Sequence, residues 1–129
     1  MHRCVFLLVA AVVMAATALP VSAQTLRKLP AQALRGELTV TQPPEILLNK
    51  KPARLAPGSR IRGADNLLAM SSAIVGQALL VHYTLDVTGN VLDVWVLTPA
   101  EAARRPWPST PQELATWSFN PDMQTWSRP

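Results

Sequence analysis

Residues 77–98 constrain the fold more than any other stretch of this chain. They read QALLVHYTLDVTGNVLDVWVLT, two runs rich in β-branched and aromatic residues on either side of a Thr-Gly-Asn turn signal. This composition predicts a β-hairpin. Because side chains alternate along a strand, one face should carry the apolar residues of both runs: Leu79, Val81, Tyr83 and Leu85 from the first, and Leu92, Val94 and Val96 from the second.

The hairpin loop must hold an even number of residues if both apolar sets face one core, because a slip of one residue turns every side chain over. A loop made only of residues 89–90 would place Asp86 opposite Asp93, and like charges in that relation destabilise a strand pair. We therefore predict a loop over 87–90. It pairs Asp86 with Val91, Thr84 with Asp93, His82 with Trp95 and Leu80 with Leu97.

Shorter β signals precede the hairpin. Strands are expected from about Gly36 to Thr41 and over 45–48 and 53–55, followed by a type II turn at 56–59. Residues 66–75 fit neither the helical nor the strand period cleanly, and we interpret them as a strand. The predicted fold class is mainly β: a small antiparallel open barrel or curled sheet of five to six strands, with one or two short C-terminal helices.

The first 23 residues have the features of a cleavable signal peptide. A basic start, Met1-His2-Arg3, precedes an apolar run over 5–18 and the small-x-small sequence Val21-Ser22-Ala23. The apolar run is shorter than the roughly 20 residues that a membrane-spanning helix needs. We therefore expect export to the periplasm in preference to secretion, and no integral membrane segment after cleavage. The single cysteine, Cys4, leaves with the signal.

Three further segments follow the signal: a flexible leader over 24–36, a β domain over 37–98, and a helical, proline- and tryptophan-rich extension over 99–129. A capping box, Thr98-Pro99-Ala100-Glu101, spans the start of the extension, and the similar sequence Thr110-Pro111-Gln112-Glu113 follows within it; each predicts a short helix. Its tryptophans either cover the outer apolar face of the hairpin or remain free for a partner, and self-packing is the ordinary outcome for so large an apolar side chain.

Catalytic signals are scarce in this sequence. It has no G-x-S-x-G elbow, no phosphate-binding loop and no spaced His and Cys set for a metal, so we expect no cofactor and no metal. His82 shares the outer face of the hairpin with Thr84, and Asp93 lies diagonally across from it. These three residues could form the site of a small enzyme or ligand-binding protein. The other interpretation is a surface histidine packed beside Trp95.

Charge points instead to a binding role. After removal of the signal, eleven Lys and Arg face eight acidic residues, a net charge near +3. The candidate binding residues are Lys50, Lys51, Arg54, Arg60 and Arg62, which lie close together without an intervening acid, and the tryptophans Trp95, Trp107 and Trp117. Such a basic set fits the phosphate or carboxylate groups of an envelope polymer or envelope protein, but it is also typical of protected strand edges. Export removes most access to nucleic acid, so we expect no nucleic-acid partner.

The hairpin sequence TLDVTGNVLDVWVL, which begins at Thr84, is similar to the D-x-x-G-x-V-x-D-V-x-V-L hairpin in the C-terminal domains of TonB-like periplasmic proteins. The whole chain also resembles short exported proteobacterial β-proteins. Both resemblances imply a periplasmic location. Together with the scarcity of catalytic signals, they lead us to expect an exported, non-enzymatic module that binds a partner in the cell envelope.

Overall fold

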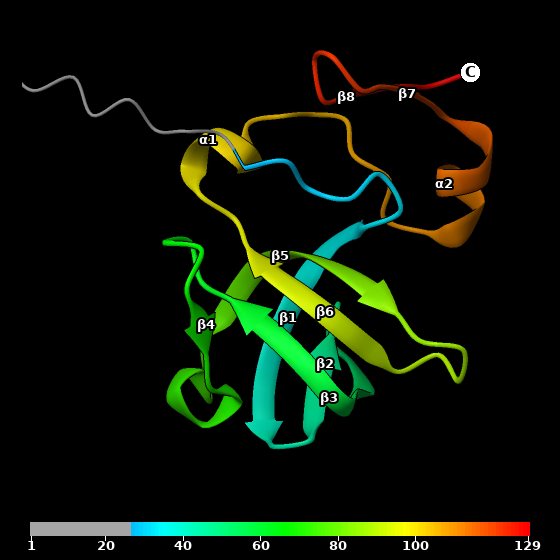
Figure 1. The fold of residues 1–129 in the computed structure, drawn as a ribbon. Helices are drawn as coiled ribbons and strands as arrows, with labels where there is room; N and C mark the ends of the chain where they lie inside the picture. The colour runs from blue at the N-terminus through cyan, green and yellow to red at the C-terminus, as the bar shows by residue number, and fades with distance from the viewer. Residues whose placement is uncertain (1–26) are drawn as a thin grey trace, which may run out of the picture.

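The computed structural model describes residues 27–129 (Figure 1), and the predicted signal peptide lies outside this range. The described chain is mainly β, as predicted, with two short α-helices. Its elements in order are β1 (Leu34–Gln42), β2 (Glu45–Leu48), β3 (Lys51–Arg62), β4 (Leu68–Ala69), the 3-10 helix η1 (Ser71–Ile74), β5 (Ala78–Leu85), β6 (Val91–Val96), α1 (Pro99–Ala102), α2 (Pro111–Thr116), β7 (Ser118–Asn120) and β8 (Thr125–Ser127).

The main sheet is mixed, which corrects the prediction of an antiparallel sheet. Its strand order is β2-β1-β5-β6-β3-β4, and β2 also pairs with β3. The pairings therefore run from β2 through β1, β5, β6 and β3 back to β2. A closed ring with an odd number of strands cannot be made of antiparallel pairs alone, and this ring has five strands. The parallel pair is β3 with β6.

Strand β3 shows a second difference from the sequence prediction. The chain does not turn at 56–59 but continues as one strand to Arg62. Gly58 has φ +76°, and the register against β6 shifts between Leu55 and Arg60. Pro57, which has no N–H to donate, falls within this irregular part of the strand. Residues 66–75, predicted as a strand, contain only the short β4 and then turn into η1.

The hairpin of β5 and β6 has the predicted pair His82 with Trp95. The predicted pairing of Asp86 with Val91 is wrong, because the register shifts and Leu85 pairs with Val91 instead. Asp86 lies in the loop, where its carboxylate accepts hydrogen bonds from the backbone N–H groups of Thr88 and Asn90, both at 2.9 Å. The shift turns Val91 into the core in place of Leu92.

Buried side chains from all five strands of the ring fill its interior. They are Leu34, Leu38, Val40, Ile46, Leu55, Ile61, Val81, Tyr83, Val91 and Val94. Leu114 of α2 packs against the same core. In Figure 1 the two α-helices and the β7–β8 hairpin lie together beyond one end of the main sheet.

The segment expected to be a flexible leader belongs to the folded structure from Arg27 onward. Strand β1 begins at Leu34, inside the range assigned to the leader, and Leu29 and Ala33 are buried before it. The backbone N–H of Arg35 also donates to the carbonyl of Pro108, at 2.9 Å. The described leader is thus held between the sheet and the C-terminal extension.

The C-terminal extension covers the outer face of the hairpin around His82, which confirms self-packing in part, while Leu80 on the same face stays 40% exposed. Trp107 and Trp126 are buried, and their ring centroids lie 6.1 Å apart. Phe119 of β7 completes the cluster at 5.0 Å from Trp126 and 6.2 Å from Trp107. The β7–β8 hairpin that carries Phe119 and Trp126 had no periodic signal in the sequence.

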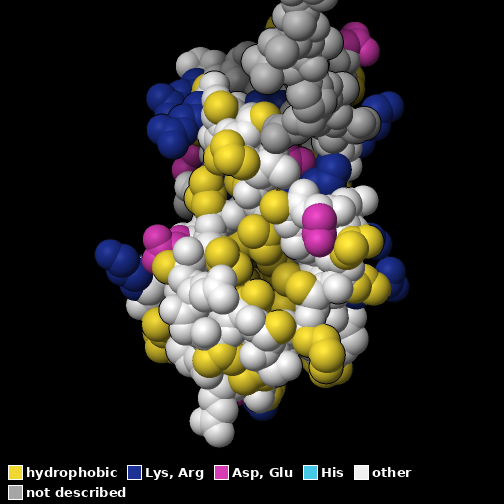
Figure 2. Space-filling view, turned by 90° about the vertical axis from the view of Figure 1, so that its left-hand side faces the viewer, with side chains coloured by type: hydrophobic (Ala, Val, Ile, Leu, Met, Phe, Trp, Pro, Cys, Tyr) yellow, Lys and Arg dark blue, Asp and Glu magenta, His cyan; other side chains and the backbone are white. Residues whose placement is uncertain are grey.

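One side of the molecule exposes apolar side chains. Figure 2 shows hydrophobic atoms spread over the side on which Figure 1 places β4. In and around β4 and η1, the exposed large side chains are Leu67, Leu68, Met70 and Val75. No helix among residues 27–129 is long and apolar enough to cross a membrane.

Candidate functional site

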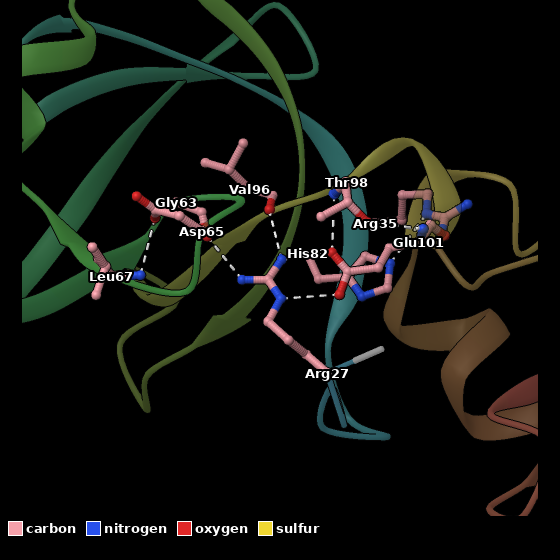
Figure 3. A network of polar contacts seen from close by, with 9 residues as sticks. All are labelled: Arg27, Arg35, Gly63, Asp65, Leu67, His82, Val96, Thr98 and Glu101. Atoms are coloured by element: carbon pink, nitrogen blue, oxygen red, sulfur yellow. Dashed lines mark hydrogen bonds and ion pairs between the residues drawn. The ribbon is translucent and has the colours of Figure 1, made fainter. Parts of the chain in front are cut away.

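A buried ion pair joins the described start of the chain to α1 (Figure 3). Arg27 donates from Nε to Glu101 Oε2 at 3.0 Å and from Nη2 to Oε1 at 2.6 Å. It also donates to the carbonyl oxygens of Gly63 and Val96, at 2.8 and 2.7 Å. Glu101 is 1% exposed and completes the predicted capping box with Thr98. One guanidinium therefore connects three separate segments of the fold.

Arg35 forms a second polar contact beneath α1. Its Nε donates to His82 Nε2 at 3.1 Å, and its Nη groups donate to the carbonyl oxygens of Ala102 and Glu101, at 3.2 and 3.0 Å. A cation at the end of a helix interacts favourably with the exposed carbonyls there. Burial and then the neighbouring Arg105 guanidinium lower the pKa of Arg35.

His82 is buried at 1% exposure, not at the surface beside Trp95 as one interpretation of the sequence had it. Its ring centroid lies 4.2 Å from that of Trp107. Burial, followed by the Arg35 charge, lowers the pKa of His82 to about 3, so the imidazole is neutral at neutral pH. Its Nε2 accepts from Arg35, which places its proton on Nδ1.

The predicted cluster of His82, Thr84 and Asp93 does not assemble. The Thr84 hydroxyl accepts a hydrogen bond from the backbone N–H of Asp93, at 3.2 Å, and His82 contacts Arg35 and Trp107 instead. The physical reason is the extension, which covers this part of the outer face and separates the imidazole from solvent.

We expect the free energy of unfolding to fall as the pH drops from about 6.5 toward 3, because His82 binds a proton at a much higher pH in the unfolded chain than in the folded protein. The stabilisation that neutral His82 contributes is fully present above its unfolded pKa of about 6.5. It is lost as the pH falls from there toward the folded pKa of about 3. The loss should be on the order of 3 kcal/mol by pH 4.5, which is two units below the unfolded pKa, since one pKa unit corresponds to about 1.4 kcal/mol. Urea unfolding at several pH values measures it.

The matched control for this pH dependence is His82→Phe, which keeps a ring against Trp107 but cannot titrate. Burial alone would raise the pKa of Glu101, but hydrogen bonds from Arg27 and Thr98 lower it, so this carboxyl contributes only at more acidic pH. The variant should therefore show a flat profile between pH 6.5 and 4.5. An equal slope in both proteins would assign the acid sensitivity to the carboxyl groups.

A groove of about 620 Å³ opens between the sheet and the extension. Its lining consists of three arginines, two tryptophans, two other apolar residues and two polar residues: Arg35, Arg105, Arg128, Trp107, Trp117, Leu80, Pro106, Ser109 and Glu113. Such a volume lies within the range of roughly 300–1,000 Å³ that is usual for small-molecule sites. We call this surface the Arg–Trp groove.

Positive charge dominates the Arg–Trp groove. Within residues 27–129, none of its three arginines has a carboxylate partner within ion-pair distance. Residues 1–26 contain no Asp or Glu that could supply one. Two of the guanidinium groups lie over tryptophan rings: Arg35 at 5.7 Å from the Trp107 centroid and Arg128 at 5.2 Å from that of Trp117. Glu113 is the one acidic residue in the lining.

The basic residues predicted from the sequence lie elsewhere, along β3 and the turn before it. Arg54 forms an exposed ion pair with Glu45 at 3.4 Å. In the parallel ladder, Arg60 is paired with Asp93 and Arg62 with Trp95. Acids from β2 and β6 thus lie beside this basic stretch, and Lys50 and Lys51 are exposed at its start. Neither these five residues nor Trp95 line the Arg–Trp groove.

Of the predicted binding residues, the groove contains Trp107 and Trp117, while sequence reasoning missed its three arginines. Arg105 stands two residues before Trp107, which is a local signal. Arg35 becomes recognisable only through its pairing with His82 across β1 and β5. In residues 27–129 no three His, Cys, Asp or Glu residues lie close enough together to hold a metal ion. No protein-family model, curated protein or solved structure matches this chain.

Proposed function

We propose that this chain is an exported, non-enzymatic binding module, and that the Arg–Trp groove holds an anionic group of a cell-envelope partner. The observation that carries this proposal is the gathering of three arginines without carboxylate partners beside two tryptophans in one groove. Arginine and tryptophan are also the residue types that contribute most to binding energy at protein interfaces. The predicted signal peptide supports the location.

The three arginines have different roles in this proposal. Arg35 already uses its Nε and both Nη groups in hydrogen bonds within the fold, so it contributes positive potential. Among the described residues, the guanidinium groups of Arg105 and Arg128 donate no side-chain hydrogen bond. They are available for the paired hydrogen bonds that a guanidinium makes with a carboxylate or phosphate.

Binding to lipopolysaccharide, which carries phosphate and carboxylate groups on sugars, tests the proposal. The double variant Arg105→Gln, Arg128→Gln should bind at least about tenfold more weakly than the wild type, since each hydrogen bond to a charged group contributes roughly 1.5–3 kcal/mol net. Higher salt should also weaken wild-type binding. Surface-immobilised lipopolysaccharide and titrated protein give the dissociation constants.

The matched control is Arg54→Gln, Arg60→Gln, which removes the same charge from β3. Retained affinity in this control, with loss in the groove variant, supports the proposal. Equal loss in both would show that net charge alone drives binding. Loss only in the β3 variant would return the site to the basic stretch that the sequence predicted.

A further inference from the structure

We infer that the Arg–Trp groove selects an acidic sugar, meaning a sugar ring that carries a carboxylate or phosphate together with free hydroxyl groups. This inference rests on the proposed function and names the ligand class for that site. Three features of the lining carry it: the cations, an acceptor carboxylate among them, and an apolar surface beside both.

Glu113 is the feature that argues against a plain anion site. A carboxylate can only accept hydrogen bonds, and it repels a second anion. Its Oε1 accepts from the hydroxyls of Ser109 and Thr110, at 3.2 and 3.4 Å. Within residues 27–129, Oε2 accepts no hydrogen bond from a side chain. A ligand that gains from Glu113 must therefore bring hydroxyl or amine donors of its own.

The apolar part of the lining argues against a ligand made only of charged groups. Leu80 is 40% exposed, and Trp117 is half-buried with Arg128 over its ring. Polyphosphate has no apolar face to bury there. A sugar ring has one, because its C–H groups lie on the two faces while its hydroxyls point outward along the rim.

An acidic sugar satisfies all three parts of the groove at once. Its anionic group pairs with Arg105 and Arg128, a neighbouring hydroxyl donates to Glu113 Oε2, and a ring face packs on Trp117 and Leu80. A neutral sugar would leave the cations unpaired, and a fatty acid would leave Glu113 without a donor. The groove therefore fits an acidic sugar better than it fits a neutral sugar or an anion without hydroxyl groups.

Three probes separate these possibilities by isothermal titration: trigalacturonate as the acidic sugar, tripolyphosphate as the plain anion, and maltotriose as the neutral sugar. The wild type should bind trigalacturonate about tenfold more tightly than maltotriose, because the guanidinium pairing is lost in the neutral compound. The decisive variant is Glu113→Met, which removes both the charge and the acceptor. It should weaken trigalacturonate binding several-fold and strengthen tripolyphosphate binding, since repulsion disappears.

Trp117→Ala provides an independent arm, with Trp95→Ala as the matched tryptophan control outside the groove. Only the Trp117 variant should weaken trigalacturonate binding, by about tenfold on the scale of a lost aromatic contact. Thermal melting checks that each variant is folded. If Trp117→Ala is unfolded, the Glu113→Met variant alone decides the test.

The outcomes distinguish this inference from the proposed function. If Glu113→Met strengthens binding of both anions, the groove is a plain anion site, which overturns the acidic-sugar inference and leaves the proposed function intact. If the Arg105→Gln, Arg128→Gln variant binds trigalacturonate and tripolyphosphate as tightly as the wild type does, both the acidic-sugar inference and the proposed function are wrong.

Discussion

Replacing Arg27 with Met is expected to destabilise the protein by about 3–5 kcal/mol, the usual loss when one partner of a buried ion pair is removed. The Glu101 carboxylate, which is 1% exposed in the wild type, would lose its cation. The carbonyl oxygens of Gly63 and Val96 would lose their donor in the same substitution. Urea unfolding at pH 7 gives the difference in free energy.

Arg54→Met is the matched control, because it breaks an ion pair of the same type at the surface. Both partners of the Arg54–Glu45 pair are more than half exposed, and such pairs contribute about 0–1 kcal/mol. Adding Glu101→Gln to Arg27→Met removes the unpaired charge and should recover part of the loss. Equal destabilisation by Arg27→Met and Arg54→Met would show that water reaches Glu101 in the folded state.

Arg27 also shows why part of the fold was beyond prediction from the sequence. It lies in a stretch without period, where an arginine looks like a solvated charge. The capping box identified Glu101 as a helix cap, and the structure confirms that role. The second role of Glu101, as the carboxylate for Arg27, depends on bringing together residues 74 positions apart. No local pattern encodes such a contact.

Local signals did predict the elements that depend on neighbouring residues. Both helices begin at their predicted N-caps, Thr98 and Thr110, and β2 spans 45–48 as expected. The pair His82 with Trp95 followed from alternation and loop parity. The parallel pair of β3 and β6 did not, because it follows from the closure of a ring of five strands. Asp86 likewise favours its turn hydrogen bonds over strand pairing, which moved the hairpin register.

The candidate site likewise contains residues that the sequence predicted and residues that depend on contacts between distant segments. Trp107 and Trp117 were selected from the sequence because exposing a tryptophan is unfavourable, and both line the Arg–Trp groove. The basic stretch along β3 has no acid within it in the sequence, but strand pairing places Glu45 opposite Arg54 and Asp93 opposite Arg60. Linear charge density cannot show these acids, since they come from other strands.

Trp107→Ala is expected to lower the free energy of unfolding by about 3–5 kcal/mol, as for other buried aromatic side chains. The ring lies against His82, Phe119 and Trp126, with centroids between 4.2 and 6.2 Å away. Its Nε1 donates to the buried carbonyl of Ala33 at 2.9 Å, so the substitution also leaves that acceptor without a partner. Urea unfolding and the binding of a hydrophobic dye measure both effects.

Trp95→Ala is the matched control, because Trp95 is half-buried on the hairpin of β5 and β6 and its loss should cost less stability. The two variants should also differ in pH dependence. Burial is the main cause of the lowered pKa of His82, so removing Trp107 should let that pKa rise toward its ordinary value and flatten the loss of stability below pH 6.5. If Trp107→Ala unfolds at the wild-type urea concentration, the extension contributes little to the fold and is held for a partner. The Arg–Trp groove would then have no fixed wall on that side, because Trp107 lies between the sheet residue His82 and the β7–β8 hairpin.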